Sequence, residues 1–211
     1  MDQTAYFEQM RQKRRTEILT AAKTMITKQG LNAFTFQQLA KTLDISTVTL
    51  YKYFKNSEDI MLAMKQQILT DDSLFGQLIP EEGDLVDRFF QAIRNLFSLI
   101  MKRRKEFTLL CLIDIYMRNE KPPQTTFFES HCMKEFRNRL FALLTAAKKE
   151  GHLQAEVETE AAFAFIERLN YALLQHIALM EDGAFKSSRD ELEKQVESLM
   201  VMHAQFLMRG R

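Results

Sequence analysis

Residues 35–55, TFQQLAKTLDISTVTLYKYFK, have the residue pattern of two short helices joined by a tight turn. Thr35 is suited to cap the first helix, because a side-chain oxygen at that position accepts a backbone N–H. The apolar residues of this helix recur at spacings of three and four: Phe36, Leu39, Ala40 and Leu43. Ser46 is suited to cap the second helix, on which Leu50 and Phe54 share one face. The stretch therefore predicts a helix-turn-helix.

The turn between the two helices carries the more specific signal. Helices that cross steeply need a small residue where they touch, and Ala40 supplies it. Asp44 occupies a position that usually requires a left-handed backbone, which Asp adopts at modest cost. Ile45 then fills the corner and Leu50 anchors the second helix. An ordinary helical hairpin in an all-α domain is also compatible with this order, so the exposed residues must decide.

The exposed faces of the second helix favour binding to duplex DNA. No carboxylate occurs from Ile45 to Ser57, whereas a solvated helix face is usually rich in Glu and Lys. Hydroxyl groups and Lys bond phosphates, and Thr and Val methyl groups contact the thymine methyl. An acidic side chain would repel the phosphates. The residues available for such contacts are Thr47, Val48, Thr49, Tyr51, Lys52 and Tyr53.

Length and composition are those of a helical globular protein. The 211 residues allow one large or two small domains, and 46% hydrophobic and 27% charged residues are ordinary values. Six Gly and three Pro are too few for a sandwich or barrel, and helical periodicity runs almost throughout. We find no apolar run of 18 residues and no apolar signal core, so we expect a cytoplasmic protein without a membrane span.

Charge is distributed unevenly along the chain. Residues 1–60 contain nine Lys and Arg against six Asp and Glu, a net charge of +3. Residues 61–211 contain 20 against 22, a net charge of −2. The mild basic excess beside the helix-turn-helix suits a site-specific DNA-binding protein. Cys111 and Cys132 lie among apolar residues and are most simply free buried thiols, with a redox pair as the alternative.

The periodic segments predict about nine helices in two domains. The first domain comprises residues 1–60, and the second, residues 61–211, forms a larger helical domain for effector binding and dimerisation. The predicted helices are about 11–29, 35–43, 46–54, 57–69, 84–104, 106–118, 125–150, 159–182 and 188–208. The helix at about 57–69 links the domains, and the nearly all-apolar stretch 106–118 predicts a buried helix.

The last two predicted helices contain heptad-like apolar repeats. Such seams either pack within the chain or pair with a second copy in a four-helix dimer interface. A dimer would present two recognition helices to a palindromic operator. The candidate interface residues are Ile166, Leu169, Leu173, Val196, Leu199, His203 and Phe206.

The first four predicted helices, roughly residues 11–68, resemble the TetR family of bacterial transcriptional regulators. ILTAAKTMITKQGLNAFTFQQLAKTLDIS is similar to the family's first helix, glycine turn and second helix, and TLYKYFKNSEDI to its recognition helix and the entry to the next helix. The resemblance implies a homodimeric regulator, usually a repressor, that a small ligand releases from DNA. The ligand would enter the second domain and shift the helix at 57–69, which changes the separation of the two recognition helices.

The same resemblance assigns roles to individual residues. Groove contacts are implied for Thr47, Val48, Thr49, Tyr51, Lys52 and Tyr53, and phosphate contacts for Thr35, Ser46 and Lys55. Asp44 replaces the usual turn Gly, Thr47-Val48 replaces a common Lys-Gly pair, and Ser57 replaces a phosphate-binding Lys. Lys55, or the basic run from Arg11 to Arg15, is available to compensate for that Lys.

The sequence gives weaker indications of the effector site. Seventeen Phe and twelve Met suit an adaptable apolar cavity, although they also suit an ordinary core. Two alternatives to ligand binding stay open for polar residues of this domain. Asp114 also suits a surface ion pair with Arg118, and His176 and His203 also suit the dimer seam. The candidate ligand-binding residues are Phe97, Asp114, Met117, His131, Phe163, Arg168, Tyr171 and Gln175.

Catalysis, metals and cofactors find little support. The sequence contains no Gly-rich phosphate loop, nucleophile elbow or paired-His metal motif, and His131 with Glu135 lacks a third ligand. We therefore expect no catalytic residue, no metal and no cofactor. Two rival hypotheses remain: an interaction protein that acts through a protein partner while on DNA, and a helical ligand carrier or enzyme without DNA binding.

Overall fold

The computed structural model describes residues 3–69, 73–120 and 131–208, except for the side chains of 73–74, 118–120 and 131–132. The described residues form α-helices and one short 3-10 helix, with no strand, which confirms the predicted all-α class. No described helix is long and apolar enough to cross a membrane. The chain divides into two compact units, each described separately below.

The N-terminal unit contains residues 1–70 and, from later in the chain, residues 108–124. Within it α1 packs against α2 and α4, and α2 packs against α3. Ile18, Ala22 and Ile26 of α1 are almost fully buried, as the periodicity predicts. Its elements are α1 (Gln3–Gln29), η1 (Leu31–Ala33), α2 (Phe36–Thr42), α3 (Thr47–Tyr51), α4 (Ser57–Leu69) and most of α7 (Arg104–Glu120).

Local side-chain chemistry sets the helix ends of this unit. The Thr35 and Ser46 hydroxyls accept backbone N–H bonds at the starts of α2 and α3, as predicted. Asp44 has a φ of 51°, which confirms the predicted left-handed turn residue. Asn56 and Asp59 form a variant of the capping box: the Asn56 Oδ1 accepts from the Asp59 N–H, and the Asp59 carboxylate accepts from the N–H of the preceding residue, Lys55.

Helix α1 begins eight residues earlier than the predicted start at Arg11. The extra residues carry no periodic apolar face toward the core, so hydrophobic periodicity could not reveal them. Their helix-forming Gln, Glu, Met and Ala residues extend the helix by propensity.

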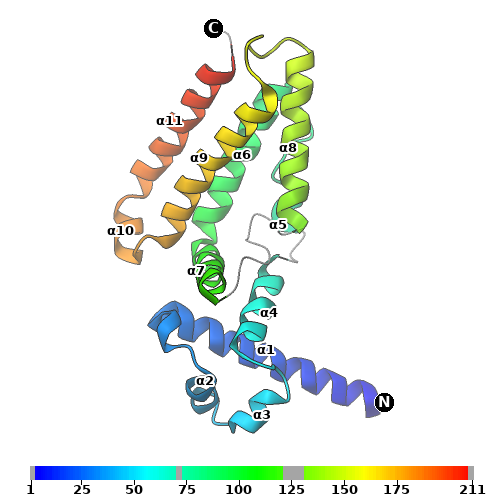
Figure 1. Cartoon of the computed structure of the whole chain (residues 1–211), viewed down its shortest axis with the longest axis vertical. Coiled ribbons are helices and arrows are strands. Elements are labelled where there is room, and N and C mark those ends of the chain that lie inside the picture. Colours follow the sequence, from blue (N-terminus) through cyan, green and yellow to red (C-terminus); the bar gives the residue numbers. More distant parts are fainter. Residues whose placement is uncertain (1–2, 70–72, 121–130, 209–211) are drawn as a thin grey trace. The chain divides into compact units, whose positions relative to one another are not determined.

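The C-terminal unit contains residues 71–107 and 125–211. Figure 1 shows α6, α8, α9 and α11 lying side by side, and contacts join α6 to α8 and α9, and α9 to α11. Its elements are α5 (Ser73–Gly76), α6 (Leu85–Lys102), the first residues of α7, α8 (His131–Lys149), α9 (Thr159–Leu179), α10 (Asp182–Ser187) and α11 (Arg189–Leu207). The short helices α5 and α10 are additional to those predicted, because single-turn segments have no measurable periodicity.

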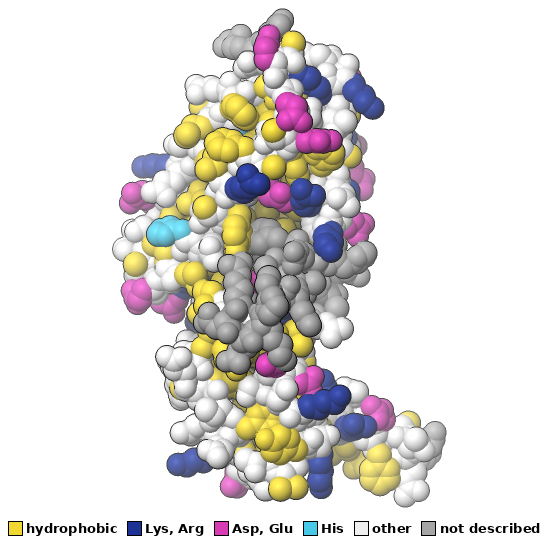
Figure 2. Space-filling model, viewed as in Figure 1, with side chains coloured by type: hydrophobic (Ala, Val, Ile, Leu, Met, Phe, Trp, Pro, Cys, Tyr) yellow, Lys and Arg dark blue, Asp and Glu magenta, His cyan; other side chains and the backbone are white. Residues whose placement is uncertain are grey.

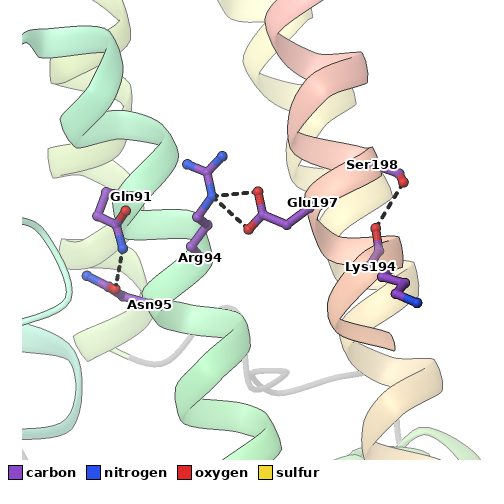
Figure 3. A network of polar contacts seen from close by, with 6 residues as sticks. All are labelled: Gln91, Arg94, Asn95, Lys194, Glu197 and Ser198. Carbon is purple, nitrogen blue, oxygen red and sulfur yellow. Dashed lines mark hydrogen bonds and ion pairs between the residues drawn. The ribbon is translucent and has the colours of Figure 1, made fainter. Parts of the chain in front are cut away.

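The helices of the C-terminal unit are joined by buried apolar faces and a few polar ties. The inward face of α6 contains Val86, Phe89, Phe90, Ile93, Phe97 and Ile100, as predicted. On the surface, the Arg94 Nε bonds both Glu197 carboxylate oxygens at 2.9 and 3.1 Å, which connects α6 to α11 (Figure 3). The buried Arg104 guanidinium donates to the Met180 carbonyl at 2.6 Å and pairs with Asp182, which fixes the connection from α9 to α10.

Candidate nucleic-acid interface and effector cavity

The outward surface of the recognition segment is formed by Val48 and Tyr51 of α3 and by Lys52, which directly follows the helix because α3 ends at Tyr51, before the predicted end at residue 54. Val48 is 68% exposed and Tyr51 is 59% exposed. Leu50 and Phe54, on the opposite face, are almost completely buried, so they fix the short helix to the rest of the unit. Figure 2 shows hydrophobic side chains exposed on the N-terminal unit beside Lys and Arg. This surface thus presents methyl, aromatic and ammonium groups that can contact base edges and phosphates.

Two contacts within the helix-turn-helix restrict the mobility of this face. The Tyr51 ring lies against the Phe36 ring with centroids 4.9 Å apart, so α2 supports an otherwise exposed aromatic side chain. The Ser46 Oγ lies 2.9 Å from the Thr49 Oγ1. Both contacts order these side chains before any DNA is bound, so less conformational entropy is lost on binding.

Arg15 of α1 holds the end of the recognition segment. Its guanidinium donates to the Tyr53 carbonyl at 2.7 Å and lies 4.1 Å from the centroid of the Phe54 ring. These contacts position the polypeptide that follows α3. Arg15 therefore has a structural partner within the chain, whereas Arg11 is exposed and forms no ion pair with a residue that the structure describes.

The predicted phosphate-binding residues lie at the edges of the same surface. Thr35, Ser46 and Lys55 are all exposed, as is Lys52, which was predicted to contact the groove. The Thr35 and Ser46 oxygens accept N–H bonds as caps, and a hydroxyl that accepts one bond still has a proton to donate. Thr47, Thr49 and Tyr53 are half-buried at the flanks of the outward face. The structure thus brings the predicted DNA-contacting residues onto one exposed region of the N-terminal unit.

A separate cavity of about 50 Å³ lies between α6, α8 and α9 in the C-terminal unit. Apolar side chains form most of its wall: Phe89, Ile93, Leu96, Met133, Phe136, Leu140, Phe163, Ile166 and Leu174. This volume holds a few water molecules, whereas small-molecule sites are usually several hundred Å³. A ligand would therefore have to displace flexible side chains such as Met133 and Phe136.

Polar groups at the cavity come from α8 and α9. The Arg137 Nε bonds the Glu167 Oε1 at 2.6 Å, and the Arg137 guanidinium lies 5.4 Å from the Phe163 ring centroid. The buried Asn170 Oδ1 lies 3.3 Å from the His203 Nε2 of α11. Burial lowers the pKa of His203 to about 4, because a charged imidazolium would lose its hydration there. His203 is therefore neutral at physiological pH.

The predicted ligand-binding residues are distributed over several places. Phe163 and Tyr171 line the cavity, whereas Phe97 is fully buried in the core of the C-terminal unit. Arg168 is exposed and Gln175 half-buried outside the cavity lining. The side chain of His131 lies outside the described residues.

Asp114 and Met117 lie on the part of α7 that belongs to the N-terminal unit. Asp114 is buried, and its Oδ1 lies 2.6 Å from the Lys65 Nζ of α4. The alternative partner, Arg118, has a side chain outside the described residues. The pairing of Asp114 with Lys65 was not predicted from the sequence.

Most of the cavity lining was not predicted. Met133, Phe136 and Arg137 of α8 had no distinguishing feature, because their convergence with α6 and α9 depends on tertiary packing. Asn170 had a signal that could have identified it, since a polar residue inside an apolar repeat is visible in the sequence. Such a residue needs a buried partner or a functional reason.

The heptad-like residues divide between the interior and the surface. Ile166, Val196 and His203 are buried within the C-terminal unit, Leu169, Leu173 and Leu199 are half-buried, and Phe206 is 44% exposed. Beside them Phe165 of α9 is 49% exposed and its ring lies 5.7 Å from that of Phe206. The two helices therefore share an exposed apolar face next to the buried one.

Cysteine and metal chemistry are not prominent in the part of the chain that is described. Cys111 is a free thiol, and burial, together with the nearby Asp114 carboxylate, raises its pKa to about 11. The side chain of Cys132 is outside the described residues. Among the residues with described positions, no three His, Cys, Asp or Glu side chains form a metal-binding group.

Comparison with known proteins places this arrangement among regulators. Residues 18–64 match the family of bacterial regulatory proteins, tetR family. The HTH-type transcriptional repressor KstR2 of Rhodococcus jostii is 27% identical over 163 residues, covering 72% of this chain and 74% of that protein.

Solved structures of two regulators have the same fold as this chain. The ketosteroid transcriptional regulator KstR2 of Mycobacterium tuberculosis has a TM-score of 0.65 at 15% identity, covering 93% of this chain and 96% of that one. The fatty acid degradation regulator FadR of Bacillus halodurans has a TM-score of 0.61 at 20% identity, covering 90% and 94%.

The capped helix pair with its exposed, carboxylate-free α3 defines a helix-turn-helix DNA-binding protein. The family match and the shared fold are more specific. The family match assigns the helix-turn-helix segment, residues 18–64, to the TetR family of bacterial transcriptional regulators, and the relative that covers most of the chain is named as a transcriptional repressor.

Proposed function

We propose that this protein is a homodimeric repressor that a small apolar or amphipathic molecule releases from a palindromic operator. The observation that carries the proposal is the exposed surface formed by Val48 and Tyr51 of α3 and the adjacent Lys52. Buried Leu50 and Phe54 fix this segment to the rest of the unit. The repressor named KstR2, which is similar to this chain, supports the direction of regulation. DNA binding requires no rearrangement of α3, since its face is already exposed.

A gel-shift assay with the DNA upstream of the protein's own gene tests operator binding. We expect Tyr51→Ala and Lys52→Ala each to weaken binding by about tenfold or more, because each removes a base or phosphate contact. Lys149→Ala is the matched control, since Lys149 is exposed on α8 of the other unit. Wild-type protein that shows no retardation even at low salt, where phosphate contacts are strongest, would contradict the proposal.

We infer that the exposed apolar face of α9 and α11 forms the dimer interface. Phe165, Met202 and Phe206 are 49%, 60% and 44% exposed, and half-buried Leu169 and Leu199 continue the same face. A contiguous apolar face of this kind is typical of an interaction site. The pairing of α9 and α11 with their symmetry mates would give a four-helix interface and two recognition helices per molecule.

Phe206→Glu is expected to convert the dimer into a monomer, because it places a carboxylate in the centre of the apolar face. Sedimentation equilibrium measures the change, with a mass near 24.8 kDa for the monomer. Val201→Glu is the matched control: Val201 is 54% exposed on α11 but points away from the Phe206 face. If Phe206→Glu and Val201→Glu have the same mass as the wild-type dimer, the interface lies elsewhere.

The cavity between α6, α8 and α9 is the proposed effector site. Its apolar wall selects a nonpolar body, and the Arg137–Glu167 pair and Asn170 supply polar contacts at known positions. The relatives described as ketosteroid and fatty acid degradation regulators support an apolar effector class. Native mass spectrometry of freshly purified protein would identify a retained ligand and report the oligomeric state in the same spectrum.

A further inference from the structure

The first four turns of α1 form a helical arm in front of the DNA-binding core. Residues 3–17 precede the segment 18–64 that matches the family, and each of them is exposed or half-buried. The first buried residue of α1 is Ile18. The arm therefore contributes little to the core of the N-terminal unit, and packing does not explain its cationic and apolar side chains.

A surface groove joins this arm to the end of the recognition segment. Phe7, Met10, Arg11 and Lys13 of α1 line one side, and Lys52 and Tyr53 line the other. Lys52 belongs to the outward surface that we propose for DNA, so the groove is continuous with it. The Arg15 bond to the Tyr53 carbonyl fixes the two sides relative to each other.

The charge in the groove is predominantly positive. Glu17 is the single carboxylate among the described residues that line it, and it already pairs with Arg14 at 2.7 Å. Arg11, Lys13 and Lys52 are exposed and form no ion pair with any residue whose position is described. Three uncompensated cations in one groove attract a polyanion and not a neutral partner.

The arm also exposes apolar groups beside these cations. Tyr6, Phe7 and Met10 are 53%, 63% and 47% exposed, and the Tyr6 and Phe7 rings touch edge-on at 5.9 Å. Figure 2 shows hydrophobic side chains at the N-terminal end of this unit next to Lys and Arg. A DNA strand offers partners for both kinds of group, because phosphates alternate with apolar deoxyribose rings and base edges.

We propose that this groove binds the DNA backbone that flanks the segment read by α3. Arg11 and Lys13 contact phosphates outside the recognition site, and Phe7 and Met10 contact the sugars between them. The inference rests on the DNA binding proposed above and adds a second, sequence-independent contact to each protomer. Contacts of this kind raise affinity and fix orientation without changing base preference.

Fluorescence anisotropy with two DNA duplexes tests the proposal. One duplex is the upstream fragment that the protein retards in the gel-shift assay. The other is a duplex of arbitrary sequence, about 30 bp long, measured at low salt, where binding requires no operator. We expect the double variant Arg11→Ala/Lys13→Ala to bind both duplexes at least tenfold more weakly, with a salt slope smaller by roughly 0.9 for each lost phosphate contact. Phe7→Ala/Met10→Ala is expected to lose a few-fold in affinity with an unchanged slope.

The control removes the same charge from the other end of the same helix. Lys23→Ala/Lys28→Ala leaves the groove intact and is expected to keep the wild-type salt slope. Equal affinities and slopes for Arg11→Ala/Lys13→Ala and this control on both duplexes would overturn the inference while the proposed function stands. Wild-type protein that binds the upstream fragment no better than the arbitrary duplex would instead overturn operator recognition. Binding of the arm to anionic vesicles without any effect on DNA affinity would also overturn the inference.

Discussion

Replacing Asp114 by alanine is expected to lower the free energy of unfolding by about 3–5 kcal/mol, because it removes the Asp114 carboxylate from a buried ion pair with the Lys65 ammonium. The Lys65 Nζ lies 2.6 Å from the Asp114 Oδ1, and both side chains are about nine-tenths buried. The ammonium cannot recover its lost hydration inside the unit. Urea unfolding followed by circular dichroism at 222 nm measures the change, since the chain contains no Trp.

A double replacement distinguishes the loss of one partner from the loss of the pair. Lys65→Met/Asp114→Leu removes both charges at similar volume and is expected to restore most of the stability. The pair joins α4 to α7, and α4 follows the recognition segment directly. We therefore expect the single variant also to weaken DNA binding. Wild-type stability in Asp114→Ala would show that the pair is hydrated and not buried in solution.

Acidification from pH 6.5 to pH 4 is expected to destabilise the protein through His203 by up to about 3 kcal/mol. Burial lowers the pKa of this imidazole to about 4, whereas in the unfolded chain it is near 6.5. Between these values the unfolded state binds a proton that the native state does not. The stability that depends on a neutral His203 is therefore fully present above pH 6.5 and is lost as the pH falls toward 4.

Comparing the pH dependence of stability between variants separates the effect of His203 from that of the carboxylates, which titrate in a similar pH range. His203→Gln keeps an amide that can donate to the Asn170 Oδ1, and it is expected to flatten the pH dependence of stability between pH 4 and 6.5. His152→Gln is the control, because His152 is half-exposed beside Glu150 in the same unit. If wild-type protein and His203→Gln lose stability in parallel over this range, His203 is protonated in the native state.

The elements set by local chemistry could be predicted from the sequence. The caps at Thr35 and Ser46, the left-handed Asp44 and the inward Leu50 and Phe54 each depend on a few neighbouring residues, and the structure contains all of them. The family resemblance follows from the same residues. The outward face of α3 was predictable because it consists of the side chains that do not pack in the core.

Contacts between distant segments could not be predicted in the same way. Lys65 and Asp114 are 49 positions apart, and nothing local to either residue indicates the other. The residues of α8 at the cavity resemble any half-apolar helix face until α6 and α9 are in place. The apolar repeats of α9 and α11 are visible in the sequence, but periodicity alone does not say which edge faces inward and which outward.

The assignment of residues 108–124 to the N-terminal unit also bears on how the protein is synthesised and engineered. A ribosome that has completed α4 has not yet made Asp114, so this unit cannot finish folding until α6 and most of α7 have emerged. A fragment that stops at residue 70 keeps Lys65 and loses Asp114. Chimeric regulators that exchange effector domains should therefore retain α7 together with its own α4, or replace both.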